Sequence, residues 1–387
     1  MTEGAERRRV FPGANTARGF FSLHRYAAVP LASRVFILKG GPGVGKSTLI
    51  RALAEELERR GLEVEEHCCS SDNESLDGLY APALGVAVLD GTPPHVLDPA
   101  CPGAVEELVN LGECWDRDAL YRDREAIVEL TGEVARAFSH AYRRLACALS
   151  ALECWEGLVE EALGSGRARL DALARELAGE VRSAGAAGAK DAGAGPEPAG
   201  GWERRLFATA ITPGGMVGYL PRLAGGVSRR WVLLGPPGAG RLRLVRAAVE
   251  AAREAGLAME AYHCSLDPDR VDHLVLPGAG VAVLSASPPH QYRPGPQDRV
   301  VDTAELLSPA VLRRVEPDLR SAEELYWSAL SQAVEFLARA KAAHDRLEAR
   351  YIPHMDFASV ERKGRAILER ALELAAGVPG AMSTAGA

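Results

Sequence analysis

Residues 40–48 read GGPGVGKST and have the types and spacing needed to hold a polyphosphate. The glycines allow the backbone to turn tightly and to aim its N–H groups at phosphate oxygens. A helix that starts near Lys46 adds the positive end of its dipole, and the Lys46 ammonium would reach the β- and γ-phosphates. The Ser47 hydroxyl would ligate Mg²⁺. The predicted nucleotide-binding residues are Gly40, Gly41, Pro42, Gly43, Val44, Gly45, Lys46, Ser47 and Thr48.

Asp90 is predicted to hold the same magnesium ion together with Ser47. It follows the apolar run VAVL at residues 86–89, which is typical of a buried strand. An acidic residue at such a strand end lies beside a phosphate-binding loop and holds magnesium, usually through water. The alternative is an aspartate that only caps the next turn.

The residue that would activate an attacking water is left open by the sequence. No second acidic residue follows Asp90 directly. Asp72 is the predicted base or water-positioning residue and would act with Lys46 in catalysis, while Asp77 and His95 are alternatives. All three candidates recur in a second copy of the motif that lacks the magnesium ligands, and this recurrence favours structural roles for them.

The chain contains this set of motifs twice, in the same order. GPPGAGRLR at residues 235–243 repeats the loop, HCSLD repeats HCCSSD, and GVAVLSASPPH repeats GVAVLDGTPPH. Such order indicates a duplication. In the second copy the lysine, the serine and the strand-end aspartate are replaced by Arg241, Leu242 and Ser285. Leucine cannot ligate a metal and serine brings no charge, so we expect no hydrolysis there, although Arg241 and the glycines could hold an anion.

The elements around the loops indicate an α/β fold. Residues 35–38, 62–66 and 84–89 read as strands, residues 9–11 and 205–207 as a further strand in each copy, and residues 46–60 as a helix that ends at Gly61. We therefore predict a parallel sheet of three or four strands per copy in a three-layer core. Each copy continues into a long helical hairpin, because apolar residues recur at threes and fours over residues 127–152 and 326–337, and a second helix follows residues 164–166 to about residue 181. The hairpins would pack on a sheet or on each other; the alternative is an arm that grips another protein.

Composition predicts four segments and a cytoplasmic protein. Residues 1–182 and 202–376 form the two copies, residues 183–201 are rich in Ala, Gly and Pro and read as a flexible linker, and residues 377–387 as a tail. We expect the copies to pack about a pseudo-twofold axis. Nothing resembles a signal peptide or a membrane span, a net charge of −7 argues against nucleic-acid binding, and the seven cysteines without a CxxC pair fit free thiols.

With these motifs, the chain resembles the P-loop NTPase superfamily. More narrowly, it is similar to a bacterial family of tandem P-loop ATPases or ATP-binding proteins. The segments that carry the resemblance are NTARGF at 15–20, FILKGGPGVGKST at 36–48, HCCSSDNESLDG at 67–78 and LDGTPPHVLDPACPGAVEELVNLGECWD at 89–116. The resemblance implies the fold and nucleotide binding, and assigns the loop functions to Lys46, Ser47 and Asp90. It implies no substrate.

Three hypotheses of function follow. The first is a Mg²⁺-dependent ATP-binding protein that hydrolyses ATP slowly in the first copy, with the second copy as a structural or regulatory partner. ATP is favoured over GTP because no NKxD-type motif is present. The second is a kinase of nucleosides or small metabolites, with Asp72 as the base. The third is a protein that binds ATP without hydrolysis and changes its interactions with a partner.

Overall fold

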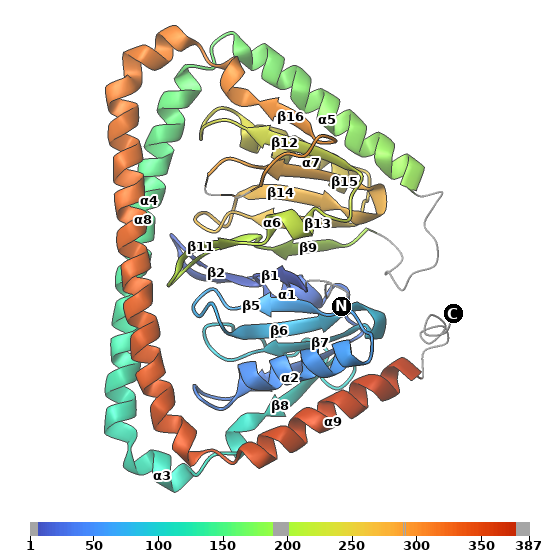
Figure 1. The fold of residues 1–387 in the computed structure, drawn as a ribbon, viewed down its shortest axis with the longest axis vertical. Coiled ribbons are helices and arrows are strands. Elements are labelled where there is room, and N and C mark those ends of the chain that lie inside the picture. Colours follow the sequence, from blue (N-terminus) through green and yellow to red (C-terminus); the bar gives the residue numbers. More distant parts are fainter. Residues whose placement is uncertain (1–6, 189–200, 289, 291, 377–387) are drawn as a thin grey trace. The chain divides into compact units, whose positions relative to one another are not determined.

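The computed structural model describes residues 7–188, 201–288, 290 and 292–376 (Figure 1). Contacts divide the chain into two compact units. The first unit comprises Met1–Gly13, Ser22–Phe138 and Leu337–Ala387, and the second comprises Ala14–Phe21 and Ser139–Phe336. The predicted α/β class and the duplicated arrangement are confirmed, because each unit is built on a mostly parallel sheet with the same strand connections.

The first unit contains a six-stranded sheet within its described residues. Its order is β1 (Arg8–Val10), β5 (Glu65–Cys68), β6 (Leu76–Ala81), β7 (Val86–Asp90), β4 (Arg34–Lys39) and β8 (Glu106–Asn110). Strand β4 lies between β7 and β8 and is parallel to both, whereas β6 is antiparallel to β5 and β7. The predicted parallel sheet of three or four strands is therefore corrected: the sheet is mostly parallel but includes the antiparallel strand β6, and it has six strands.

Strand β6 was missed because its sequence, LDGLYA, carries a charged residue and a glycine at its centre. All six of its residues are nevertheless buried. A Cβ atom at Gly78 would lie 2.7 Å from Leu89 of β7, so the glycine lets two neighbouring strands pack closely. Asp77 is thereby carried into the interior, where it faces the candidate site described below.

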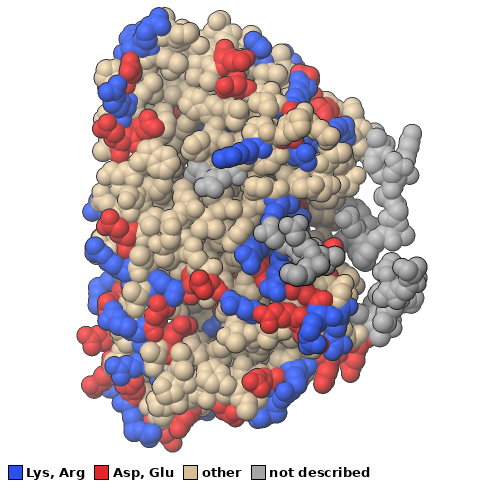
Figure 2. All heavy atoms as spheres, in the orientation of Figure 1, with Lys and Arg blue, Asp and Glu red and all other residues tan. Residues whose placement is uncertain are grey.

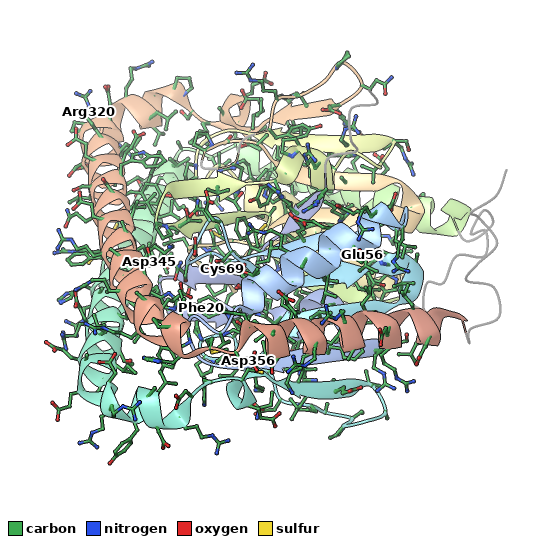
Figure 3. The ribbon with its side chains drawn as sticks, turned by 60° about the horizontal axis from the view of Figure 1, so that its bottom comes forward. Phe20, Glu56, Cys69, Arg320, Asp345 and Asp356 are labelled. Atoms are coloured by element: carbon green, nitrogen blue, oxygen red, sulfur yellow. The ribbon has the colours of Figure 1, made fainter. Side chains whose placement is uncertain are left out.

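Two helices cover the part of the first sheet that bears the glycine-rich loop. Helix α2 (Lys46–Arg59) matches the prediction to within one residue, and its leucines and Ile50 are buried. Gly61, with φ 77°, follows its end. Helix α9 (Phe357–Ala376) lies beside α2, as Figure 3 shows near the labelled Glu56 and Asp356. Short elements complete this unit: α1 (His24–Ala28), η1 (Pro82–Leu84), η2 (Leu111–Glu113), α3 (Arg117–Arg122) and η5 (Ile352–His354).

The second unit repeats this sheet. Its order is β16 (Arg299–Asp302), β12 (Arg229–Leu234), β15 (Val281–Ser285), β14 (Val271–Leu276), β13 (Met259–His263) and β9 (Glu203–Leu206). As in the first unit, one strand, β14, is antiparallel to its neighbours. The other described elements are α5 (Gly166–Gly188), α6 (Leu220–Leu223), α7 (Arg241–Glu254), η3 (Pro277–Ala279), η4 (Thr303–Leu306) and the hairpins β2 (Gly13–Thr16)–β3 (Gly19–Ser22) and β10 (Thr209–Thr212)–β11 (Gly215–Gly218).

The long helices carry each copy into the unit of the other copy. Helix α4 (Arg124–Glu161) leaves the first unit at Phe138, and α5 then packs on α7 in the second unit. Helix α8 (Pro309–Tyr351) enters the first unit at Leu337, and α9 then packs on α2. Each sheet therefore carries helices from both copies, so the two compact units combine residues from both predicted ranges, 1–182 and 202–376.

The beginning of the predicted linker is helical. Helix α5 continues through residues 183–188, although two of these six residues are glycines, which disfavour a helix. Within this extension Ala184 is buried. The rest of the predicted linker, residues 189–200, and the predicted tail, residues 377–387, lie outside the described residues. No described helix is both long and apolar enough to span a membrane.

Candidate functional site

The first glycine-rich loop, residues 40–45, connects β4 to α2 with the backbone that a phosphate-binding loop requires. Gly43 has a φ of 68° and Gly45, which precedes the helix, a φ of 85°. Residues with a Cβ rarely adopt these left-handed conformations. No side chain among the described residues caps the N-terminus of α2. The first N–H groups of this helix therefore face the loop, where an anion would satisfy them.

Lys46 turns back over the loop. Its Nζ donates to the carbonyl oxygens of Gly40 and Gly41, at 2.7 and 2.9 Å, and lies 3.6 Å from Oδ2 of Asp90. Asp90 is buried, and its Oδ1 accepts a hydrogen bond of 2.8 Å from the backbone N–H of Thr92. Asp90 thus caps the next turn and also faces the lysine, and its role as a magnesium ligand stays a prediction.

The other predicted ligands of nucleotide and metal begin α2. The Ser47 hydroxyl accepts a hydrogen bond of 2.9 Å from the backbone N–H of Leu76, at the start of β6. Thr48 lines a groove between α2 and α9. A second hollow, of about 740 Å³, opens beside the loop and is lined by Gly40 and Gly41, by the turn after Asp90 and by Trp115. This hollow offers space next to the first glycine-rich loop.

The C-terminal helices cover the first loop directly. Oε1 of Glu348, on α8, accepts a hydrogen bond of 3.2 Å from the backbone N–H of Gly43. A Cβ at Gly43 would lie 2.9 Å from the Glu348 carbonyl oxygen, and one at Gly45 would lie 3.4 Å from Phe357 of α9. The Glu348 carboxylate therefore accepts a hydrogen bond from an N–H group that a bound phosphate would use. Sequence reasoning missed Glu348, because nothing local links a glutamate on a distant helix to this loop.

Asp72 is held by its own turn and by the same helix. Its oxygens accept hydrogen bonds from the N–H of Glu74 and the hydroxyl of Ser75, and Oδ2 lies 3.4 Å from Nζ of Lys341. None of its interactions within the described part of the chain reaches Lys46 or Asp90. The two alternatives to Asp72 do lie near Asp90.

His95 and Asp77 form a buried group with a residue that sequence reasoning did not single out, His24. Nε2 of His95 lies 3.2 Å from Oδ2 of Asp77, and its Nδ1 lies 3.9 Å from Oδ2 of Asp90. Nε2 of His24 lies 3.8 Å from the same Asp77 oxygen. A lone histidine in a five-residue helix gave no signal, because only the fold brings it to Asp77.

Burial shifts the pKa of all three groups toward the neutral form. It lowers the pKa of His24 to about 3, with a further contribution from His67. It lowers the pKa of His95, although the Asp77 charge opposes the shift. It raises the pKa of Asp77, although His95 opposes this shift. The His-Cys-Cys segment is a buried strand end: β5 contains His67 and Cys68, and burial raises the pKa of the Cys69 thiol well above its ordinary value.

The second loop keeps the backbone geometry but not the chemistry. Gly238 and Gly240 have φ values of 82° and 100°. Arg241 follows them, and burial lowers its pKa although Asp272 and Glu156 oppose the shift. A Cβ at Gly238 would lie 2.3 Å from the Glu156 carbonyl oxygen, so α4 covers this loop as α8 covers the first.

A cavity of about 410 Å³ in the second unit is lined by Arg241 and Ser285 together with mostly apolar side chains. The second loop thus lacks counterparts of the lysine, the serine and the strand-end aspartate, although the carboxylates of Glu156, Asp272, Asp302 and Glu323 also line this cavity. Acidic and basic side chains are interspersed on the faces of both units visible in Figure 2. Comparison with family models, with curated proteins and with solved structures found no match to this chain.

Proposed function

We propose that the first unit is a P-loop domain that binds Mg·ATP and hydrolyses it slowly. The observation that carries this proposal is the loop itself. Two glycines with positive φ lead into a helix whose N-terminus no described side chain caps, and the Lys46 ammonium lies 3.6 Å from the Asp90 carboxylate. This arrangement provides N–H donors, a cation and a metal-binding carboxylate at one strand end.

The residues present fit a nucleotide and its magnesium ion. Bound Mg·ATP supplies the phosphoryl group and a cation that neutralises its charge. Lys46 would exchange the carbonyl oxygens of Gly40 and Gly41 for phosphate oxygens. Ser47 and Asp90 would hold the cation, and the hollow beside the loop has room for the rest of the nucleotide. That the Gly43 N–H already accommodates a carboxylate supports an anion site at this position.

Binding at this loop requires Glu348 to leave the Gly43 N–H. We therefore propose that ATP competes with α8 for the first loop, so that nucleotide binding releases the helical cover. This contact also favours a second candidate function, an ATP-responsive protein without appreciable turnover. Helices α9 and α5 pack against α2 and α7 within the chain. The second candidate would change its interactions with a partner protein when this cover is released. All seven cysteines are free thiols, which is consistent with a cytoplasmic location.

Titration of Mg·ATP into the full chain, monitored by calorimetry, tests the proposal. We expect binding by the wild type and its loss in Lys46→Ala, with turnover lowered by roughly 10²-fold or more, as for other key electrostatic groups. Arg241→Ala is the matched control at the second loop and should change neither quantity. Absence of heat with the wild type, or unchanged ATPase activity in Lys46→Ala, would refute the assignment. Binding with negligible wild-type turnover would select the second candidate.

A further inference from the structure

The buried group formed by His24, Asp77 and His95 gathers three metal-ligating side chains from separate elements. His24 comes from α1, Asp77 from β6 and His95 from the turn after β7. One ligand atom from each residue can be chosen so that all three lie within 4.8 Å of one another. Each residue is at most 6% exposed. Burying three such polar side chains together costs free energy unless hydrogen bonds or a bound ion offset the cost.

The distances fit one central ion. Ligand atoms that surround an ion at 2.0–2.1 Å in a tetrahedron lie about 3.4 Å apart. The Asp77 Oδ2 atom lies 3.2 Å from Nε2 of His95 and 3.8 Å from Nε2 of His24. Within the described residues, neither that oxygen nor Nε2 of His24 has a hydrogen-bond partner. An ion between the three side chains would satisfy both atoms.

A neighbouring hydroxyl orients the imidazole of His24 as in known metal sites, since its Nδ1 lies 3.0 Å from the Ser22 hydroxyl. Metal-binding histidines usually donate their second ring N–H to an oxygen in this way, which directs the other nitrogen toward the ion. Nδ1 of His95 faces Oδ2 of Asp90 at 3.9 Å, which is beyond hydrogen-bond distance. The thiol of Cys69 donates to the Asp77 carboxylate and helps to fix it.

The second unit contains the counterpart of this group but lacks the residue that corresponds to His24. Its aspartate and histidine keep their positions, since Nε2 of His290 lies 3.1 Å from Oδ2 of Asp272. The first residue of the short helix is Leu220 there, where the first unit has His24. The additional histidine, His273, accepts a hydrogen bond of 3.0 Å from the N–H of Ser285 through Nδ1, so its Nε2 carries the proton. Within the described residues, two histidines and an aspartate with ligand atoms within 4.8 Å of one another therefore converge at this place in the first unit and not at its counterpart in the second.

We propose that His24, Asp77 and His95 bind one divalent transition-metal ion, of the class that prefers imidazole nitrogen, with Zn²⁺ as the first candidate. Two nitrogens and one carboxylate oxygen leave a position open for water. The ion would lie on the side of His95 that faces away from Asp90. It would be distinct from the magnesium ion proposed at Ser47, because magnesium takes oxygen ligands. The proposal does not depend on ATP binding.

Equilibrium dialysis of the chelator-treated full chain against Zn²⁺, without nucleotide, tests the site. We expect one tightly bound ion per wild-type chain, and Co²⁺ in its place should give visible absorption typical of a low-coordinate site. His24→Leu introduces the residue of the second unit and should weaken binding by at least ~100-fold, since residues that merely orient ligands already contribute 10–100-fold. Ser22→Ala keeps the ligands and should have a smaller effect.

Two variants are matched controls. His290→Gln alters the incomplete group of the second unit, and His344→Gln alters a partly exposed group on α8 with Asp345 and Glu348. Both should bind Zn²⁺ as the wild type does. Equal affinity in folded His24→Leu and wild type, or loss of binding in His344→Gln, would overturn the proposal. A failure of ATP binding would leave it standing, because no nucleotide is present in this assay.

Discussion

Replacing Glu348 with glutamine should strengthen the binding of Mg·ATP to the first loop. The carboxylate accepts a hydrogen bond from the Gly43 N–H, and its negative charge lies where phosphate charge is proposed to bind. Glutamine retains the size of the side chain but removes this charge. The contact between α8 and the loop should weaken, and the loop should become more available to the nucleotide.

The structure gives the size of this effect. A hydrogen bond to a charged group contributes about 1.5–3 kcal/mol. The Glu348 side chain is 35% exposed, so water screens it and the lower end applies. About 1.5 kcal/mol corresponds to a roughly tenfold lower Kd for Mg·ATP, because the apparent affinity rises with the fraction of chains whose loop is uncovered.

Calorimetric titration of wild type and Glu348→Gln measures this difference. Glu335→Gln is the control, since Glu335 is an exposed glutamate on the same helix and the substitution removes the same charge. Its Kd should equal that of the wild type. An unchanged or higher Kd in Glu348→Gln would show that the carboxylate does not compete with the nucleotide, and the proposed release of α8 would have to be abandoned.

Two further predictions concern stability. Gly166→Ala should destabilise the second unit, because the new Cβ would lie 2.1 Å from the Leu306 carbonyl oxygen. Gly179→Ala on the same helix places its Cβ where nothing lies within 4 Å and should stabilise the unit by about 0.5–1 kcal/mol. A denaturant titration that ranks the two variants in the opposite order would contradict this prediction. Burial lowers the pKa of His273 well below 6.5, so below pH 6.5 the unfolded chain takes up a proton that the folded chain does not. Stability should then fall with decreasing pH by about 1.4 kcal/mol per unit, and denaturant titrations of His273→Gln that show the wild-type pH slope would exclude this histidine as a cause.

The parts of the fold that the sequence predicted are those with strong local signals. Four apolar residues of β4, the glycine-rich loop and the apolar face of α2 follow one another directly, and the structure places them as expected. The repeated motifs likewise predicted two sheets of the same design. Strand β6 carries no such signal, because its burial depends on Gly78 packing against β7 and on partners for the Asp77 carboxylate, and both come from distant residues.

The candidate site shows the same limit. The sequence motif alone predicted a site at Lys46, Ser47 and Asp90, because the glycine-rich loop and the end of the apolar strand can both be recognised from local sequence. Glu348 and His24 were not predicted, because their roles arise from long-range packing: an apolar stripe indicates that a helix is buried, but not against which sheet. Asp72 was chosen for its place after β5, whereas the fold places Asp77 and His95 next to Asp90.

The exchange of arms explains why the linker is not a boundary between independent folding units. A fragment ending at residue 180 would contain α2 without α9, and so would leave Leu49 and Leu53 facing a groove that Phe357 and Leu368 otherwise line. The same fragment would carry α5 without α7, whose Leu244 and alanines complete the core around Leu170 and Leu177. Because burial of such side chains contributes about 1.5–3 kcal/mol each, both losses weigh heavily against a marginal net stability. The second copy, whose loop lacks the lysine and the serine, therefore has a structural role: its helices α8 and α9 complete the unit that holds the first loop.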